Sequence, residues 1–500
     1  MKLPKLRMSA ESVFCISLFF VFTCWAFASP NGSVPDEAFH LKSIYCYGKK
    51  LGPCEVPKFI TDEPCFGWGP GGGNGSPHPD TTPACVDETS LTTKVKISTD
   101  STNEGTNSYQ GGYYGFMHNF VAESLRTTVF RIRMLNTAIC STVIFLILRI
   151  SRHRQNLARA FIFAVVATYV PLAFYFIPSV STASWSFIGP TASWVPLLIL
   201  FDSAAQRNEK NRATFIVLIC LLLSFASKPE ALVYTFLVFL STFLLSNKSF
   251  KVKIELVVLL IAIVRPLIEL LTTISANTAV IFRGFSGSEA TTFFSPYYTS
   301  HNLPKIISLY AGQWAQTLGD TDFTTPSTTM LLSFVAMSTI LIIGFRSFSK
   351  YKFLVISLYL FLMAAVPTVI LNLSQRQVGA YITARYLWAM LFGLLFVANW
   401  TASRNFVSDQ SKQVAIACGA ANFAAIGALF AVLRRYTVGA SSTSWNLDAD
   451  KLWWWNTPVT PLTLLGLAFV VQTIFFGSAY KILTRTEEAD MPLPLSSRSR

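Results

Sequence analysis

Two adjacent carboxylates and a histidine stand a few residues after the first apolar segment of the chain. They are Asp36, Glu37 and His40, in the sequence Val34-Pro35-Asp36-Glu37-Ala38-Phe39-His40. A carboxylate can take a proton from a hydroxyl group or bind a cation, and a histidine at this spacing lies on the same helical face as the acids. Because acidic groups are costly beside lipid, the pair indicates a functional site.

The same residues also suit the first turn of a helix. Pro35 is typical of the first helical position, and acids there interact favourably with the helix dipole. Side chains of adjacent residues diverge on any regular element, so only one of Asp36 and Glu37 is expected to point into a given site. A general base oriented by a second acid, and a plain helix start, are both compatible with the sequence.

Several basic residues are expected on the same side of the membrane as these acids. Arg385 and Tyr386 begin the tenth apolar segment, while Arg434 and Arg435 end the eleventh. Lys and Arg normally concentrate on the cytoplasmic side, so these positions run against the usual distribution. We expect them to bind an anion at headgroup depth, such as a lipid phosphate. The alternative for Arg385 is an interfacial arginine beside a membrane-belt tyrosine.

Two further features have both a structural and a functional interpretation. Arg265 follows the middle of the seventh apolar segment, four residues before Glu269, and the spacing allows an intrahelical ion pair. The alternative is a phosphate-binding arginine freed by the kink at Pro266. Trp453-Trp454-Trp455 precede the last apolar segment, where an aromatic belt is typical and stacking on a sugar ring is the alternative.

The composition indicates a membrane protein. Of 500 residues, 52% are hydrophobic and 13% are charged, whereas soluble proteins carry about 25% charged residues. Many apolar runs approach the roughly 20 residues that span a bilayer, which predicts an all-α polytopic membrane protein. The net charge of +14 does not indicate nucleic-acid binding, because the basic residues recur in short clusters between apolar segments.

We predict twelve spans, with both termini on the cytoplasmic side. Loops rich in Lys and Arg alternate with loops poor in them, which requires an even number of crossings. The fourth span is weakened by Pro190 and Pro196. The predicted spans are residues 11–29, 134–150, 160–178, 186–203, 213–227, 230–246, 254–272, 328–345, 352–372, 387–403, 413–433 and 460–482.

The spans divide the chain into six parts. Residues 113–133 are expected to form an interfacial helix that leads into the second span. Ala26-Phe27-Ala28 fits a signal-peptide cleavage site, but we favour a retained first span. The parts are span one (1–29), a large outer loop (30–133), spans two to seven (134–272), a second outer segment (273–327), spans eight to twelve (328–482) and a cytoplasmic tail (483–500).

Four cysteines fall in the first outer loop: Cys46, Cys54, Cys65 and Cys85. An even set on the outer side predicts two disulfides in an oxidising compartment, with the connectivity left open. Zinc binding is the alternative, although the loop has no Cys-x-x-Cys pair. The chain also lacks nucleotide-binding, zinc-protease and serine-hydrolase motifs, so an activated donor would arrive from the membrane.

The chain resembles a family of bacterial integral-membrane proteins long described as a domain of unknown function. The resemblance runs from about residue 30 to 482 and rests on four motifs in matching order. The family usually has Gln-Gly-Arg-Tyr where this chain has Thr383-Ala384-Arg385-Tyr386. The motifs are Pro35-Asp36-Glu37-Ala38-Phe39-His40, Gly319-Asp320-Thr321-Asp322 with Pro326, Ala384-Arg385-Tyr386, and Arg434-Arg435-Tyr436 with Gly439.

That family is similar in layout to GT-C type glycosyltransferases, which take sugars from polyprenyl-phosphate donors. The resemblance implies a catalytic carboxylate in the first outer loop, which falls on Asp36 or Glu37. It implies a GT-C-like enzyme of the bacterial inner membrane that moves a sugar to an envelope glycan acceptor on the outer face. We expect substrate-binding roles for His40, Arg265, Asp322, Arg385, Tyr386, Arg434 and Arg435.

Two other functions are compatible with the sequence. The main alternative is a transporter or flippase for a lipid-linked saccharide, which needs polar groups near the membrane midplane. A non-catalytic scaffold for envelope assembly is the third. The sequence specifies no cofactor, and a divalent cation, Mg²⁺ or Mn²⁺, on the acidic pair is an alternative to a metal-free site.

Overall fold

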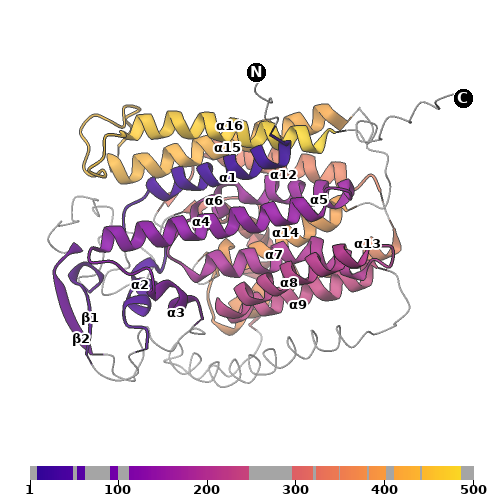
Figure 1. Cartoon of the computed structure of the whole chain (residues 1–500), viewed down its shortest axis with the longest axis horizontal. Coiled ribbons are helices and arrows are strands. Elements are labelled where there is room, and N and C mark those ends of the chain that lie inside the picture. Colours follow the sequence, from indigo (N-terminus) through magenta and orange to yellow (C-terminus); the bar gives the residue numbers. More distant parts are fainter. Residues whose placement is uncertain are drawn as a thin grey trace, which may run out of the picture.

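A bundle of long helices that run along one axis makes up most of the protein in the computed structural model (Figure 1). The structure describes residues 8–48, 53–61, 91–98, 112–246, 295–318, 323–347, 349–379, 382–400, 410–439 and 442–485. The helices of the bundle are α1 (Ala10–Phe27), α4 (Leu125–Ile150), α5 (Gln155–Thr168), α7 (Thr182–Phe201), α8 (Arg207–Ala226), α9 (Pro229–Leu245), α12 (Ser327–Gly344), α13 (Lys350–Leu373), α14 (Ala384–Asn399), α15 (Ser411–Thr437) and α16 (Pro461–Leu483).

Eight of the described helices are long and apolar enough to cross a membrane, which confirms the predicted all-α polytopic membrane protein. Helices α9 and α14 are apolar but shorter, and α8 carries four charged residues among its first six. Residues 254–272, predicted as the seventh span, lie outside the described residues. The eight are α1, α4, α5 as continued by η4 (Tyr169–Ala173) and α6 (Phe174–Phe176), α7, α12, α13, α15 and α16.

The hydroxyl groups of Ser17 and Thr23 in α1 are hydrogen-bonded within the helix. The helix begins after Ser9, whose Oγ accepts from the Ser12 N–H at 3.2 Å. Ser17 and Thr23 donate their hydroxyls to carbonyls four residues earlier, at 2.7 and 2.8 Å. In lipid no water can pair these groups or the backbone, so a helix that satisfies them internally is the favoured structure.

The segment before the second span differs from the prediction of one interfacial helix over residues 113–133. A short helix, α3 (Gly112–His118), is followed by α4, which starts at Leu125. Ser124 caps α4 by accepting from the Thr127 N–H at 3.2 Å. The span thus begins nine residues earlier than predicted, and Arg133 lies within it, buried in the bundle rather than exposed at the membrane surface.

The two ends of the bundle differ (Figure 1). One, the capped end, carries α2 (Glu37–Tyr45), α3, and the antiparallel strands β1 (Pro53–Pro57) and β2 (Lys94–Ser98). At the other, the terminal end, Nη1 of Arg485 lies 3.4 Å from Oε1 of Glu11. Since α1 starts and α16 ends there, the first and last described helices begin and finish on one side.

A disulfide ties the parts of the cap together. Cys46, at the end of α2, is bonded to Cys54 in β1. The prediction of disulfides in this loop is therefore confirmed for one pair, whereas Cys65 and Cys85 lie outside the described residues. Nδ1 of His118 in α3 lies 2.8 Å from the Ile44 carbonyl, which fixes α3 against α2.

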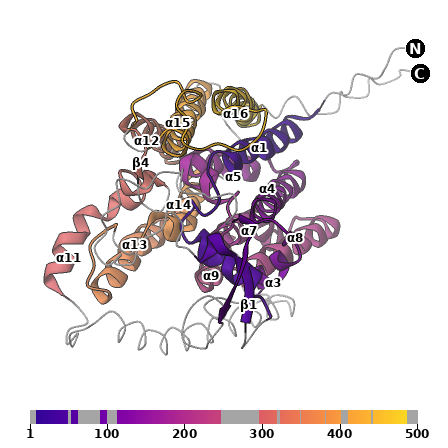
Figure 2. The same cartoon turned by 90° about the vertical axis from the view of Figure 1, so that its left-hand side faces the viewer.

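Helix α14 lies in the middle of the bundle, among α5, α7 and α13 (Figure 2). Its interior face is aromatic and tightly packed: Phe396 stacks on Trp194 of α7 with ring centres 4.8 Å apart. Near the end of α14, Ala398 lies so close to Gly344 of α12 that a Cβ added to Gly344 would be 2.6 Å from the Ala398 carbonyl oxygen. This packing holds the first residues of α14 at the capped end.

The remaining described elements connect α9 to α12. They are α11 (Pro296–Asn302), the 3-10 helices η5 (Leu303–Leu309) and η6 (Trp314–Gln316), and the short antiparallel pair of β3 (Thr317–Leu318) and β4 (Phe323–Thr324). Asn372 near the end of α13 accepts from the Ser295 N–H at 3.2 Å. In the cap, η1 (Lys58–Ile60) directly follows β1.

Candidate functional site

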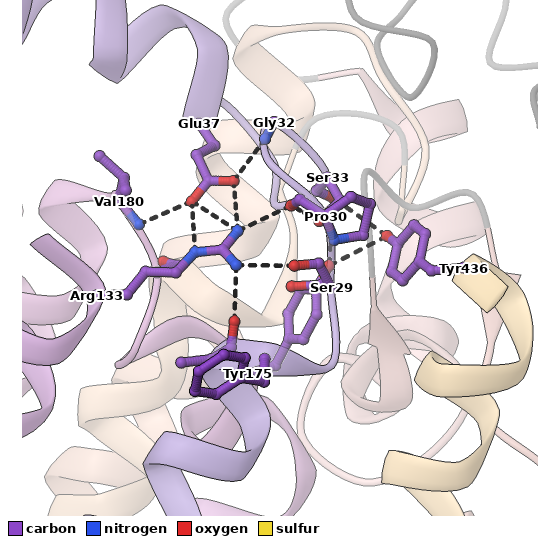
Figure 3. A network of polar contacts seen from close by, with 12 residues as sticks. Ser29, Pro30, Gly32, Ser33, Glu37, Arg133, Tyr175, Val180 and Tyr436 are labelled. Atoms are coloured by element: carbon purple, nitrogen blue, oxygen red, sulfur yellow. Dashed lines mark hydrogen bonds and ion pairs between the residues drawn. The ribbon is translucent and has the colours of Figure 1, made fainter. Parts of the chain in front are cut away.

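Glu37 is buried in an ion pair with Arg133 of α4 (Figure 3). The side chains are 0% and 2% exposed. Nη2 of Arg133 lies 2.8 Å from Oε2 and 3.1 Å from Oε1 of Glu37, and Nε lies 3.2 Å from Oε1. The backbone N–H groups of Gly32 and Val180 donate to the same carboxylate at 2.9 and 3.0 Å. Both carboxylate oxygens are thus fully hydrogen-bonded, as a buried charge requires.

Arg133 also organises the turn between α1 and α2. Its Nη1 donates to the carbonyls of Ala26 and Ser29, both at 2.8 Å, and its Nη2 donates to Pro30 at 2.9 Å. All N–H groups of the guanidinium therefore have acceptors. The pair of Arg133 and Glu37 accordingly holds the chain leaving α1 in one conformation and fixes where α2 begins.

Two tyrosines complete the network around this turn (Figure 3). The hydroxyls of Tyr175 and Tyr436 both donate to the Ser33 carbonyl at 3.2 Å and lie 3.2 Å from each other. Tyr436 belongs to the Arg434-Arg435-Tyr436 motif at the end of α15, so this motif reaches the turn that carries the acids. The distance between the two segments in sequence is about four hundred residues, and only the fold joins them.

Asp36 has a different environment from its neighbour. It precedes the first residue of α2 with a left-handed backbone, φ 62°, which Asp tolerates better than most residues. Its side chain is 43% exposed, and its Oδ2 lies 2.6 Å from Nη2 of Arg385 at the start of α14. The two adjacent side chains thus diverge, one into the bundle and the other toward α14.

Arg385 and Lys228 bring two cations to this place from the amino ends of α14 and α9. The Arg385 guanidinium lies 4.9 Å from the ring centre of Tyr386, and its Nη2 donates to the Tyr386 hydroxyl at 3.0 Å. Lys228 is 2% exposed, and its ammonium is 5.0 Å from the same ring centre. A small pocket between α7, α9 and α14 is lined by both cations with Ser186, Glu230, Tyr234 and Tyr386.

The surrounding charges set the protonation states of Asp36 and His40. Burial alone would raise the pKa of Asp36, but nearby positive groups, Arg385 first among them, hold it below its usual value. Burial, together with the charge of Lys228, lowers the pKa of His40 to about 3. At neutral pH the site therefore contains an ionised Asp36 and an uncharged His40.

His40 is fully buried between α2 and α3. Its Nδ1 lies 2.9 Å from the hydroxyl of Tyr114, and its backbone N–H donates to the Asp36 carbonyl at 2.9 Å. The ring is 0% exposed. The histidine therefore supports the first turn of α2, next to Asp36, rather than lining the open side of the site.

The other predicted site residues lie at varying distances from the pocket. Arg434 covers the ring of Phe430 at 5.6 Å, and Arg435 is 5% exposed beside Tyr436. Neither arginine is among the described residues that line the pocket of Lys228 and Arg385. Trp455 donates its indole N–H to the Phe27 carbonyl at 2.7 Å and so packs on the end of α1. Arg265 and Asp322 lie outside the described residues.

A cation held between Asp36 and Glu37 does not fit this geometry. Both oxygens of Glu37 are occupied by Arg133 and by backbone N–H groups, and Asp36 points away from them. Across the described ranges, no group of three or more Asp, Glu, His and Cys side chains is arranged to hold a metal ion. We therefore derive no step through a metal on the acidic pair.

Sequence reasoning assigned no role to Glu230 or Tyr234. It counted Arg133, before the second span, and Lys228, at the turn between the fifth and sixth spans, only among the basic residues expected on the outer side beside the acids. Only the early start of α4 buries Arg133, and only the packing of α9 against α14 brings Lys228 and Tyr234 to Tyr386, whose carbonyl accepts from the Tyr234 hydroxyl at 2.5 Å. The signal available in the sequence was a lysine directly before Pro229 at the start of an apolar segment.

Residues 19–394 match a family described as "Predicted membrane protein (DUF2142)". The chain belongs to this family. The matched range contains both acids, Arg133 and every residue that lines the pocket of Lys228 and Arg385. Tyr436, which contacts the turn before α2, lies outside that range. No curated protein and no solved structure matches the chain.

Proposed function

We propose that this protein is a GT-C-like glycosyltransferase that moves a sugar from a polyprenyl-phosphate donor to an envelope glycan acceptor. The observation that carries the proposal is an exposed carboxylate, Asp36, held against Arg385 and near the buried Lys228 at the edge of a pocket. A base beside two cations suits a reaction in which a hydroxyl loses a proton while a phosphate leaves.

The reaction assigns one role to each group. Asp36 accepts the proton of the acceptor hydroxyl, whose oxygen forms a new bond to the anomeric carbon of the donor sugar. The bond from that carbon to the phosphate oxygen breaks, and the polyprenyl phosphate leaves with the electron pair. Arg385 and Lys228 stabilise the charge that develops on this phosphate. Glu37 takes no part in the proton transfer and holds the turn through Arg133.

The proposal places the capped end on the outer face of a bacterial inner membrane and both termini in the cytoplasm. The disulfide of Cys46 and Cys54 in the cap supports this orientation, because disulfides persist in oxidising compartments. Twelve spans are part of the proposal. Ser246 lies with Asp202 at the terminal end and Ser295 lies with Asn372 at the capped end, as a seventh span between them requires.

A transfer assay with matched variants tests the proposal. Purified protein in nanodiscs receives a panel of radiolabelled polyprenyl-phospho-sugars and an envelope glycan acceptor. We expect Asp36→Asn to lower the rate at least 10²-fold, the usual scale for loss of a general base. Asp448→Asn, which removes an acid elsewhere at the capped end, is the control and keeps the wild-type rate. Absence of transfer by the wild type across a broad panel overturns the enzyme assignment.

One observation favours the transporter alternative. Helices α7 and α9 line the pocket at the capped end and also a second one of about 210 Å³ at the terminal end, which the start of α5 and Trp400, directly after α14, line as well. Along α7, Trp194 lies between the residues that line the two pockets, and its ring contacts those of Phe396 and Tyr359. Movement of a fluorescent lipid-linked saccharide between leaflets of proteoliposomes, abolished by Arg385→Met and without sugar transfer, would establish the alternative.

A further inference from the structure

We infer that Asp36 and Arg385 form an exchangeable ion pair. A phosphoryl anion that enters the pocket beside Lys228 takes Arg385 away from Asp36 and so releases the carboxylate. The identity of the anion, a polyprenyl phosphate, rests on the proposed function, whereas the exchange itself needs only a phosphate group. Anion binding would then precede and enable the use of Asp36 as a base.

The two neighbouring ion pairs differ in burial, and this difference supports the release of Asp36 from Arg385. Glu37 and Arg133 are almost wholly buried, and each has additional hydrogen bonds to the backbone that hold it in place. The Asp36 side chain is 43% exposed, and water can replace the arginine as its partner. The Arg385 side chain is 12% exposed, so the pair is open to solvent on the Asp36 side. A partly exposed ion pair contributes little to stability, and a better partner for Arg385 can displace Asp36.

The charges in the pocket support the binding of a phosphoryl anion. Lys228, Arg385 and Glu230 line the pocket, and Asp36 adds a second carboxylate through its ion pair with Arg385. When Asp36 turns away, the pocket keeps two cations and one carboxylate, a net charge of +1. A phosphate group restores the balance and can accept from the guanidinium in the bidentate geometry that Arg favours.

The backbone around Asp36 allows its side chain to move alone. The His40 N–H donates to the Asp36 carbonyl at 2.9 Å, and the Glu37 N–H donates to the Val34 carbonyl at 2.9 Å. The anchored Glu37 therefore keeps the left-handed turn in place while the exposed carboxylate rotates toward solvent. The charged and titratable groups that face Asp36 are Arg385 from α14, Lys228 before α9 and His40 on α2. Of these, Arg385 is the partner lost in the exchange.

The exchange has a consequence that a simple contact with substrate does not share. Because Asp36 competes with the anion for Arg385, removing its charge should tighten anion binding although it stops transfer. We expect Asp36→Asn and Asp36→Ser to lower the dissociation constant for polyprenyl phosphate about fivefold, the scale of an exposed ion pair. Arg385→Met should raise it at least tenfold.

Binding is measured by native mass spectrometry or microscale thermophoresis in detergent, on variants whose thermal unfolding matches the wild type. Polyprenyl phosphate, inorganic phosphate and polyprenol without phosphate are compared, so that the phosphate and the lipid are separated. Asp448→Asn removes a different acid from the capped end and should leave the dissociation constant unchanged.

Unchanged or weaker binding of polyprenyl phosphate in both Asp36 variants overturns the exchange, and so does an equal gain in Asp448→Asn. A gain for inorganic phosphate as well as polyprenyl phosphate supports recognition of the phosphate itself. If the Asp36 variants bind more tightly but the wild type transfers no sugar, the exchange stands and the proposed function fails.

Discussion

Adjacent residues of the same charge have opposite environments at the start of α2. Glu37 sits where water cannot reach, so its charge persists only because Arg133 and two backbone N–H groups replace the lost hydration. Asp36 stays in contact with solvent and has Arg385 as its ion-pair partner. The proposed reaction therefore uses Asp36, the acid that can change its partner, whereas Glu37 fixes the turn.

Breaking the buried pair should destabilise the protein more than any change at Asp36. Glu37→Gln leaves an unpaired guanidinium in the bundle and should lower the free energy of unfolding by about 3–5 kcal/mol. The reverse variant, Arg133→Met, should cost a similar amount, and the double variant should cost less than the sum of the two. Asp36→Asn should change it by about 1 kcal/mol or less. Thermal unfolding in detergent measures all four, and equal losses for Glu37→Gln and Asp36→Asn contradict the assignment.

His40 should make stability depend on pH. Its pKa is about 3 in the folded protein and near 6.5 when exposed, so the unfolded chain binds more protons between these values. Stability is therefore retained above about pH 6.5 and falls as the pH drops toward 3, by at most about 1.4 kcal/mol per pH unit.

The variant His40→Gln, which keeps a polar partner for Tyr114, should flatten this dependence between pH 4.5 and 6.5. Asp36 remains ionised in most of that window because its pKa is lowered, so it does not mask the effect. Unfolding midpoints in a pH series give the answer. Parallel curves for the wild type and His40→Gln would show that another group is responsible.

At the scale of elements, the amino ends of α9 and α14 bring the cations to the site, and the close packing of α14 keeps them there. Gly344 of α12 lies against the backbone of Ala398. A methyl group at position 344 meets a carbonyl that cannot rotate away, so Gly344→Ala should destabilise by about 1–3 kcal/mol. Gly466→Ala in α16, where no atom lies within 4 Å of the added Cβ, should be neutral or slightly stabilising. Thermal unfolding compares the two, and equal midpoints contradict the packing argument.

The helices could be predicted better than the site. Apolar runs of the right length gave α1 as 11–29 against Ala10–Phe27 and α16 as 460–482 against Pro461–Leu483, because lipid leaves the backbone few alternatives. The fourth predicted span is one helix, α7, in spite of its two prolines. Sequence spacing placed Asp36 and Glu37 at a helix start but could not distinguish them, since their environments depend on residues 96 and 349 positions away.

At the scale of the molecule, α7 and α9 line pockets at both ends of the bundle. Between these ends, Trp194 of α7 stacks on Phe396 of α14. Asp36, Arg385 and Lys228 are all at the capped end, so an enzyme needs only that end to be accessible. A transporter would also need the aromatic packing of Trp194 and Phe396 to open.

The orientation of the whole molecule can be tested through its ends. Glu11 and Arg485 are in contact at the terminal end, so α1 starts and α16 finishes on one side of the membrane. With the capped end outside, the start of α1 and the end of α16 must both be cytoplasmic. The arginines at the terminal end agree with the usual concentration of positive charge on the cytoplasmic side.

Green fluorescent protein fused after Arg500 should therefore fluoresce in cells, whereas alkaline phosphatase at the same position should be inactive. Phosphatase inserted after Ser444, in the loop between α15 and α16 at the capped end, is the matched control and should be active. The opposite pattern in the pair would place the capped end in the cytoplasm, where the Cys46–Cys54 disulfide would be reduced and Asp36 could not meet an envelope acceptor.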